Sequence, residues 1–248
     1  MTELLKIEHL CVKAGRKEIL KDLSLSIPMG QVHAIMGPNG CGKSTLSKVI
    51  AGDPAYTITG GSILFKGKNV LDMSVNQRAN EGIFLAFQHP VALPGVGMAL
   101  LLKTAINAKR KYLGQEPMDA VRFMKYMKLR TTALGVTDEM LKRPVNVDFS
   151  GGEQKRLETF QMAMLEPDFC ILDEMDSGLD VDALKIVGQA VSVMREKHRS
   201  FMIITHHDDL LKYVLPDAVS VMRDGTVVKT GGPDLVKIIE EQGFDAIG

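Results

Sequence analysis

The sequence predicts an α/β fold built on a parallel sheet, and three features of the chain indicate it. A glycine-rich segment, residues 37–44, follows the apolar run Val32–Met36 and precedes a helical pattern at Thr45–Ile50. Helical patterns such as Asp182–Lys197 separate later apolar runs, which gives the strand and helix alternation of a doubly wound sheet. These short runs are wholly apolar, as is typical of strands buried on both faces, and they occupy residues 83–87, 169–172 and 201–204.

Three segments ahead of and beside the glycine-rich segment have alternating or β-branched character: Leu4–Val12, Ile19–Ile27 and Ser62–Phe65. Turn residues separate them, so they predict a small antiparallel β layer. Strand signals vanish between Val91 and Glu166, where helical patterns take over at about residues 97–113, 118–128 and 153–165. We therefore expect a helical subdomain, residues 91–166, inserted into an α/β core of residues 1–90 and 167–248.

Composition is typical of a cytoplasmic globular protein. The 248 residues are 45% hydrophobic and 24% charged, with 30 acidic residues against 30 Lys plus Arg. Zero formal net charge gives no basic excess for binding nucleic acid or a membrane surface. No apolar run approaches the roughly 18 residues that span a bilayer, and the N-terminus lacks the apolar core of a secretory signal. We expect a soluble protein of the cytoplasm.

Residues 37–44 match the phosphate-binding loop G-x-x-x-x-G-K-S in the strand and helix context which that motif requires. Glycines let backbone N–H groups turn toward phosphate oxygens, and the start of the next helix adds unpaired donors. We expect Lys43 to neutralise the outer phosphates and Ser44 to ligate Mg²⁺. A glycine-rich turn that binds nothing does not account for a match at all four fixed positions. The sequence predicts a nucleoside triphosphate site at Gly37, Pro38, Asn39, Gly40, Cys41, Gly42, Lys43, Ser44 and Thr45.

The three cysteines, Cys11, Cys41 and Cys170, are far apart and form no C-x-x-C motif. Neither a disulfide framework nor a zinc or iron–sulfur site is indicated. Cys41 lies inside the phosphate loop, near a helix N-terminus and Lys43, and both features favour a thiolate. Alkylation of Cys41 is therefore expected to block nucleotide binding, although loops of this kind usually need only a small residue there.

Polar side chains follow the buried strands where each one ends. Gln88 follows the run 83–87, Asp173 and Glu174 follow the run 169–172, and Thr205-His206 follow the run 201–204. Because parallel strands share one carboxyl edge, these groups are expected to gather around the phosphates.

The chemistry of these side chains suggests their roles. Asp173, with Ser44 and Gln88, suits Mg²⁺, which takes oxygen ligands. Glu174 is the candidate general base for a water attacking the terminal phosphate, and His206 is placed to donate a hydrogen bond to that phosphate. The alternative is that all are ordinary solvated groups at strand ends, which the neighbouring phosphate loop makes less favourable.

A second glycine-rich element, Ser150-Gly151-Gly152-Glu153, opens a helical run that continues to Leu165. Ser150 suits an N-cap and Glu153 completes a capping box, so a purely structural interpretation is available. Two adjacent glycines exceed what a cap needs, however, and they allow a phosphate to approach the backbone N–H groups closely. We therefore interpret Ser150, Gly151 and Gly152 as nucleotide-binding residues.

In their order along the chain, six motifs resemble those of the ATP-binding-cassette (ABC) ATPases, and the resemblance covers essentially the whole chain. They are the phosphate loop, Gln88, residues 150–153, residues 170–174, Ser177–Asp180 and His206. The resemblance implies a P-loop NTPase fold with a RecA-like core, an antiparallel β subdomain and an inserted helical subdomain. It also implies ATP hydrolysis with Mg²⁺, and head-to-tail pairing in which Ser150, Gly151 and Gly152 of one copy cap the nucleotide on Lys43 and Ser44 of another.

More specific segments resemble the SufC type of cassette, from the Suf iron–sulfur cluster assembly machinery. They are residues 82–90, Leu93–Val96, Phe149–Glu153 and Asp176–Lys185. This resemblance implies SufB and SufD as partners in place of transmembrane subunits, reshaped by ATP-driven pairing of two cassettes. It implies docking of those partners around His89–Val96 and the helix that follows.

Some positions depart from the wider cassette pattern or leave choices open. Lys13 and Ala14 stand where an aromatic residue commonly stacks on adenine, so similar affinities for ATP and GTP are expected. Lys155 or Arg156 is expected to pair with Glu174 in a resting monomer, although both also suit a solvated helix face. Two other classes remain as alternatives. One is the ATPase subunit of a membrane transporter, and the other is a nucleotide-dependent module of DNA repair or translation.

Overall fold

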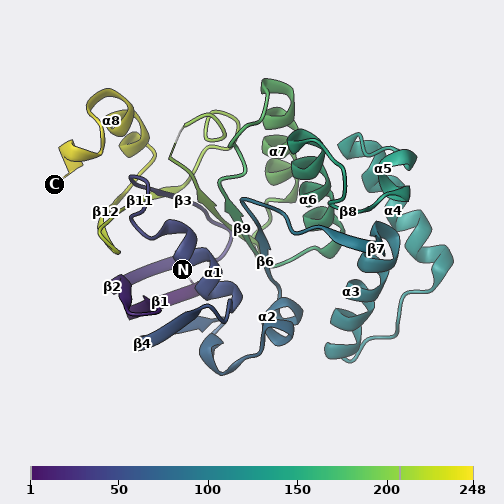
Figure 1. Cartoon of the computed structure of the whole chain (residues 1–248), viewed down its shortest axis with the longest axis horizontal. Helices are drawn as coiled ribbons and strands as arrows, with labels where there is room; N and C mark the ends of the chain where they lie inside the picture. Colours follow the sequence, from purple (N-terminus) through teal and green to yellow (C-terminus); the bar gives the residue numbers. More distant parts are fainter. Residues whose placement is uncertain (1, 207, 248) are drawn as a thin grey trace.

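The structure is a computed structural model that describes residues 2–206 and 208–247, and the strands within them form three sheets. The largest sheet has the order β12-β11-β3-β10-β9-β6 (Figure 1). Its parallel strands are β3 (Val32–Met36), β6 (Ile83–Ala86), β9 (Phe169–Asp173), β10 (Ser200–Ile204) and β11 (Ala218–Arg223). The buried strands expected from the apolar runs are therefore confirmed, and their carboxyl ends share one edge.

The hairpin at the other edge of this sheet was not anticipated from the sequence. Strand β12 (Thr226–Gly231) runs antiparallel to β11, and Asp224 and Gly225 turn between them with φ of 49° and 87°. An Asp-Gly pair between apolar runs is a strong hairpin signal, so the sequence did contain the information. Gly225 also has a packing role, since a Cβ there would lie 2.1 Å from the carbonyl oxygen of Ile19.

The second sheet is the predicted antiparallel layer, with the order β2-β1-β4-β5. Its strands are β1 (Glu3–Ala14), β2 (Lys17–Pro28), β4 (Tyr56–Phe65) and β5 (Lys68–Asn69). Strand β4 begins six residues before the expected Ser62–Phe65, because its first half pairs with the end of β1, with Ala14 opposite Tyr56.

Helices pack against the sheets and fill the inserted segment. Around the sheets lie α1 (Lys43–Ala51), α2 (Val75–Glu81), α7 (Val181–Met194) and α8 (Asp234–Gln242). Short 3₁₀ turns occupy Val70–Asp72 and Phe244–Ile247. The inserted segment, on the right of Figure 1, contains α3 (Met98–Tyr112), α4 (Ala120–Leu134), α5 (Asp138–Lys142) and α6 (Gly151–Leu165).

The inserted segment is not wholly helical, which corrects the expectation that strands are absent from residues 91–166. Strands β7 (Leu93–Gly97) and β8 (Pro144–Val145) pair antiparallel, with Leu93 opposite Val145. Strand β7 contains Pro94 and Gly95, residues with poor strand propensity. Only the partner strand, some 50 residues away in sequence, makes this stretch extended.

Three buried apolar clusters hold these layers together within the described residues. Alternate residues of each parallel strand enter two of them: Ile171 joins the cluster under the antiparallel layer, while Cys170 and Leu172 join the cluster under α7 and α8. Side chains alternate across a strand, so these clusters lie on opposite faces of the large sheet. The third cluster lies among α3, α4 and α6.

We find no helix in residues 2–206 and 208–247 that is long and apolar enough to cross a membrane.

Candidate active site

The phosphate loop lies between β3 and α1, as the sequence predicts, and two of its glycines have a clear conformational reason. Gly40 and Gly42 have φ of 78° and 107°, which other residues rarely adopt. A Cβ on Gly42 would also lie 2.8 Å from Leu20 Cδ2. Gly42 is the N-cap of α1, which has no side-chain cap and no acidic residue in its first turn. The first N–H groups of α1 are therefore available to an anion.

Lys43 extends its side chain over this loop. Its Nζ donates hydrogen bonds to the carbonyl oxygens of Gly37 at 2.8 Å and Pro38 at 3.0 Å, and the residue is buried. A buried ammonium group with neutral acceptors is poised to bind an anion that reaches the loop.

Cys41 behaves differently from the expectation. It is only 6% exposed and belongs to the cluster under the antiparallel layer, and burial raises the pKa of its thiol. Lys43 opposes this shift, but burial is the larger cause. The prediction of a favoured thiolate at Cys41 is therefore wrong, because a desolvated sulfur disfavours negative charge.

Asp173 meets the start of α1 from the end of β9. Ser44 Oγ donates to Asp173 Oδ1 at 3.1 Å, and Ser47 Oγ donates to Asp173 Oδ2 at 2.7 Å. Burial raises the pKa of the Asp173 carboxyl, while both serine hydroxyls oppose that shift. The predicted neighbours Ser44 and Asp173 thus lie together, with their oxygens side by side next to the phosphate loop.

Glu174, Gln88 and His206 converge from the ends of three neighbouring strands. Gln88 Nε2 donates to Glu174 Oε2 at 2.5 Å, and His206 Nδ1 lies 3.6 Å from Glu174 Oε1. The backbone of Glu174 has φ of 48° and donates from its N–H to the Ile204 carbonyl at 2.9 Å. A non-glycine residue in this region costs about 1 kcal/mol, and such strain is concentrated at functional sites.

Neither Lys155 nor Arg156 pairs with Glu174, which corrects the expected resting ion pair. Lys155 Nζ bonds to the carbonyl oxygens of Phe87 and Gln88, and Arg156 Nη1 donates to the Gly135 carbonyl at 3.2 Å. The periodicity of α6 gave no sign of this, because the acceptors of Lys155 lie about 70 residues earlier in the chain and the acceptor of Arg156 lies 21 residues earlier.

The tip of α6 has the predicted capping box. Ser150 Oγ accepts from the N–H of Glu153 at 3.3 Å, and Glu153 Oε2 accepts from the N–H of Ser150 at 2.8 Å. Beyond the backbone of its own helix, a Cβ on Gly151 or Gly152 would meet open space among the described residues, and neither glycine has a positive φ. Packing among the residues that the structure describes therefore gives no reason for either glycine. Among the described residues, no hydrogen bond or ion pair joins residues 150–153 to the phosphate loop.

Two further polar residues near the site, Ser47 and Glu158, were missed by sequence reasoning, and so was the partner of Thr205, a residue that was itself expected at this edge. Ser47 lies three positions after Ser44 and so on the same face of α1, a spacing that did indicate it. Glu158 Oε1 accepts from the N–H of Phe87 at 3.0 Å, and Thr205 Oγ1 donates to Asp176 Oδ2 at 2.5 Å. The last two pairs are distant in sequence, so no local pattern reveals them.

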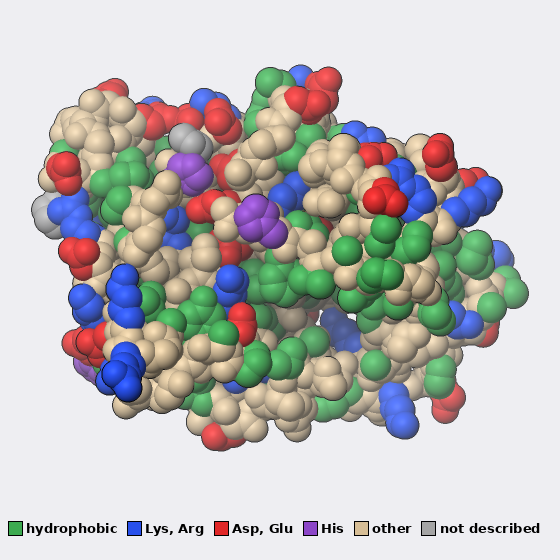
Figure 2. Space-filling model, in the orientation of Figure 1, with side chains coloured by type: hydrophobic (Ala, Val, Ile, Leu, Met, Phe, Trp, Pro, Cys, Tyr) green, Lys and Arg blue, Asp and Glu red, His purple; other side chains and the backbone are tan. Residues whose placement is uncertain are grey.

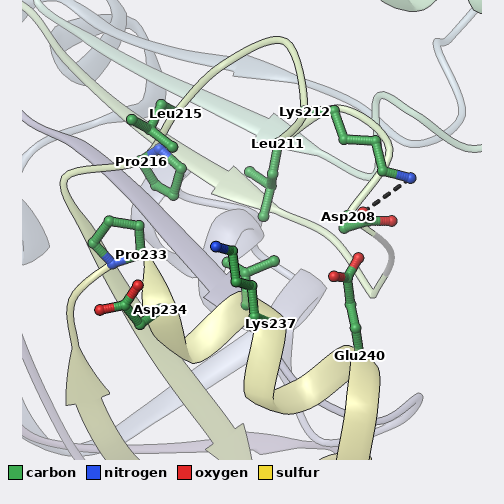
Figure 3. A pocket seen from close by; sticks show the side chains of 10 residues that line it. Asp208, Leu211, Lys212, Leu215, Pro216, Pro233, Asp234, Lys237 and Glu240 are labelled. Atoms are coloured by element: carbon green, nitrogen blue, oxygen red, sulfur yellow. Dashed lines mark ion pairs between the residues drawn. The ribbon is translucent and has the colours of Figure 1, made fainter.

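A separate hollow of about 330 Å³ lies between α8 and the turn that follows β10 (Figure 3). Lys212 Nζ lies 2.9 Å from Asp208 Oδ2 at its rim, while Leu211 and Pro233 contribute apolar surface. Asp208 is two positions beyond His206 in sequence, but the lining includes none of the predicted site residues.

Comparison with known proteins supports the chemistry of this site. The family model described as ABC transporter matches residues 20–177. The probable ATP-dependent transporter SufC of Escherichia coli (strain K12) is 52% identical over 241 residues, which are 97% of each chain.

Solved structures agree with the fold. The ADP conformation of MJ1267, an ATP-binding cassette of an ABC transporter, is 26% identical with a TM-score of 0.77, covering 100% of this chain and 98% of that one. The dimeric post-hydrolysis state of the cassette MJ0796, bound to ADP and Pi, has a TM-score of 0.77 and covers 92% of this chain and 98% of that one. At 18% identity, that second likeness concerns the fold alone. With a phosphate loop, an aspartate and a strand-end glutamate in one place, the chain belongs to the ABC transporter family as an ATP-hydrolysing cassette.

Proposed function

We propose that this cassette is the ATP-hydrolysing subunit of an iron–sulfur cluster assembly complex of the SufBCD type, working in the cytoplasm. The observation that carries the proposal is the identity of 52% to SufC of Escherichia coli over 97% of both chains. An alignment over 97% of this chain extends across the segments beyond the general ATPase motifs.

Hydrolysis in this proposal depends on residues that the fold brings together. Lys43 and the first N–H groups of α1 bind the outer phosphates, and Glu174 acts as the general base toward the attacking water. Gln88 holds the carboxylate of Glu174, and His206 donates to the terminal phosphate. A positioned base typically contributes about 10²–10⁴ in rate.

The donor set beside the phosphate loop fits Mg²⁺. Ser44 Oγ and Asp173 Oδ1 are 3.1 Å apart. In nucleotide-binding proteins Mg²⁺ takes most of its ligands from phosphate and water, so one hydroxyl and one carboxylate are enough from the protein. When bound, Mg²⁺ would neutralise charge on the phosphate oxygens. Gln88 is the proposed third ligand, through its amide oxygen.

We also propose that two copies pair head to tail around ATP. Ser150 is exposed at the tip of α6, and Gly151 and Gly152 leave open space where side chains would otherwise lie. Glycine in a helix lowers stability by roughly 0.5–1 kcal/mol relative to alanine. Two glycines at this tip therefore suggest that a group outside the chain must approach its backbone closely. The phosphates held by a second copy fit that space, since a helix N-terminus binds anions.

The proposed docking surface for SufB and SufD is the segment His89–Val96 with the exposed face of α3. Val91 and Leu100 are 63% and 64% exposed although apolar. A hollow of about 210 Å³ beside them is lined by Phe87, Pro90, Val91 and Leu93, among others. Figure 2 shows apolar side chains gathered over the middle and right of this face, with a hollow between α2 and α3. Exposed apolar patches of this kind mark sites of protein association.

The alternative is an ATPase subunit of a membrane transporter, which would use the same site residues. The Escherichia coli relative is named a probable ATP-dependent transporter, which favours this alternative. Co-purification discriminates between the two functions. Recovery of the tagged chain with SufB and SufD from soluble extract supports the first, and recovery with a polytopic membrane protein supports the second.

A matched pair of variants sharpens this experiment. Val91→Asp places a charge on the proposed docking surface, whereas Val193→Asp places one on α7 at a residue that is 82% exposed. Only Val91→Asp is expected to abolish recovery of SufB and SufD. Equal recovery with both variants would show that the partners dock elsewhere.

A further inference from the structure

Two buried charged residues of α6 make hydrogen bonds to the backbone just after the end of β6. Lys155 and Glu158 are 5% and 4% exposed, and Lys155 Nζ lies 3.5 Å from Glu158 Oε2. Lys155 Nζ donates to the carbonyl oxygens of Phe87 at 2.7 Å and Gln88 at 3.0 Å. Glu158 Oε1 accepts from the N–H of Phe87 at 3.0 Å. One ion pair thus makes three hydrogen bonds to two consecutive residues.

Stability alone gives a poor reason for this arrangement. Removing two charges from water costs several kcal/mol for each ion, and apolar residues of similar volume are often at least as stabilising. What the pair does supply is geometry, because three charge-assisted hydrogen bonds fix the Phe87 and Gln88 peptide relative to α6.

The same short segment reaches the candidate base. The main chain of Gln88 is held by Lys155, while its side chain donates to Glu174 Oε2 at 2.5 Å. A continuous set of contacts therefore runs from α6 through Gln88 to Glu174. Helix α6 begins directly after Ser150, so the capped tip and the buried ion pair belong to one rigid element.

We propose that Lys155 and Glu158 are positioning residues that hold the Phe87–Gln88 backbone in place, so that the side chain of Gln88 stays against Glu174 in the same chain. This inference rests on the roles of Gln88 and Glu174 given under the proposed function, and it adds what controls them.

The test compares three variants of the full chain on one helix. Glu158→Ala removes the acceptor for the Phe87 N–H, and Glu158→Gln keeps an acceptor oxygen of similar reach. Thr159→Val is the matched control, because Thr159 is buried on α6 but donates only to the Lys155 carbonyl of its own helix. Measured quantities are kcat and KM for ATP, and amide hydrogen exchange in the peptide that contains Phe87.

Glu158→Ala is expected to lower kcat about tenfold with KM changed less than about twofold, a size typical of coupling between contacting residues. It should also speed exchange of the Phe87 amide. Glu158→Gln should recover most of the rate and most of the protection, and Thr159→Val should change neither. Equal loss in Glu158→Gln and Glu158→Ala, or unchanged exchange at Phe87, would overturn the proposal.

A double variant separates this inference from the proposed function. In a Gln88→Ala background, adding Glu158→Ala should have no further effect on kcat, because the two residues act in series. Additive losses would show that Glu158 acts by another route and would overturn the inference. If Gln88→Ala alone hydrolyses ATP at the normal rate, the proposed role of Gln88 is wrong, and both that role and the inference about Lys155 and Glu158 are overturned. If Gln88→Ala is slow but Glu158→Ala is normal, only this inference falls.

Discussion

Gln88 Nε2 donates a hydrogen bond of 2.5 Å to Glu174 Oε2, which joins the carboxyl ends of the neighbouring strands β6 and β9. The backbone N–H of Glu174 bonds in turn to Ile204 of β10, on the other side. Glu174 is therefore held from both flanking strands: its carboxylate from the β6 side and its backbone from β10. In the proposed mechanism, small movements of Gln88 would align or release Glu174 as the base.

Glu174→Gln is expected to lower the rate of ATP hydrolysis by at least about 10², because the amide cannot accept a proton from water. Affinity for ATP should change less than threefold, since Glu174 holds no phosphate. Phosphate release and equilibrium binding measure the two quantities. Light scattering on the variant with ATP should show a dimer.

Glu166→Gln is the control for that experiment, because Glu166 caps the far end of α6 and pairs with Arg130 away from the site. A Glu174→Gln variant that hydrolyses ATP as fast as Glu166→Gln would rule out Glu174 as the base.

Lys43→Ala should weaken ATP binding roughly 10- to 100-fold, the range expected for a lost hydrogen bond to a charged group. Lys43 is the buried cation over the loop, whereas Lys48 lies one turn further along α1 and carries no contact to the loop carbonyls. Titration calorimetry on Lys43→Ala and Lys48→Ala makes the comparison, and similar affinities in both would contradict the role of Lys43.

Gly151→Ala and Gly152→Ala should raise the free energy of unfolding of the isolated chain by roughly 0.5–1 kcal/mol, because alanine is the better helix former and meets no atom. The same variants should lose ATP-driven dimerisation. Urea unfolding and light scattering with ATP report the two effects.

Gly188→Ala in α7 provides a contrast, since its Cβ would lie 2.5 Å from the Tyr213 Cβ and should destabilise the fold. If Gly151→Ala and Gly152→Ala both dimerise normally with ATP, the head-to-tail pairing at this tip is wrong.

His33 makes stability depend on pH in the acid range. Burial lowers the pKa of His33 to about 4, against an ordinary value of 6.5. The unfolded chain therefore binds the proton more tightly, and stability falls as pH decreases from about 6.5 to about 4, by at most about 3 kcal/mol. His33→Gln weakens the contact with Ser220, so this variant should be less stable than the unchanged protein at pH 7.5. It should nevertheless lose less stability on acidification.

Urea unfolding of both proteins at pH 7.5 and pH 5 measures this difference. Other acidic groups titrate in both proteins alike, so they cancel in the comparison. A parallel loss of stability in His33→Gln would mean that His33 does not cause it.

Thiol reactivity should rank Cys11 first, Cys41 second and Cys170 last. Cys11 is partly exposed, while burial raises the pKa of both other thiols, most strongly for the fully buried Cys170. Only the thiolate reacts with alkylating reagents. Mass spectrometry after timed alkylation gives the order, and fastest modification at Cys41 would restore the activated thiol that the sequence suggested.

Much of the site was predictable because its chemistry is local. The phosphate loop depends on eight consecutive residues, and the capping box at Ser150 depends on four. Asp173, Glu174 and Gln88 were expected to lie near one another because each lies at the carboxyl end of a buried strand, and parallel strands bring such residues to one edge. The resemblance of these motifs to a known family agreed with the comparison of whole chains.

The sequence by itself determined the order of the buried strands and helices around the site, and the kinds of side chain available there. Tertiary structure decided which of those side chains are desolvated and which distant partner each one meets. Lys155 bonds to backbone atoms about 70 positions earlier in the chain. Burial in the core raises the pKa of the Cys41 thiol, and pairing with β8 keeps β7 extended. Burial and long-range hydrogen bonds arise from the packing of the whole chain, so no local pattern of residues contains them.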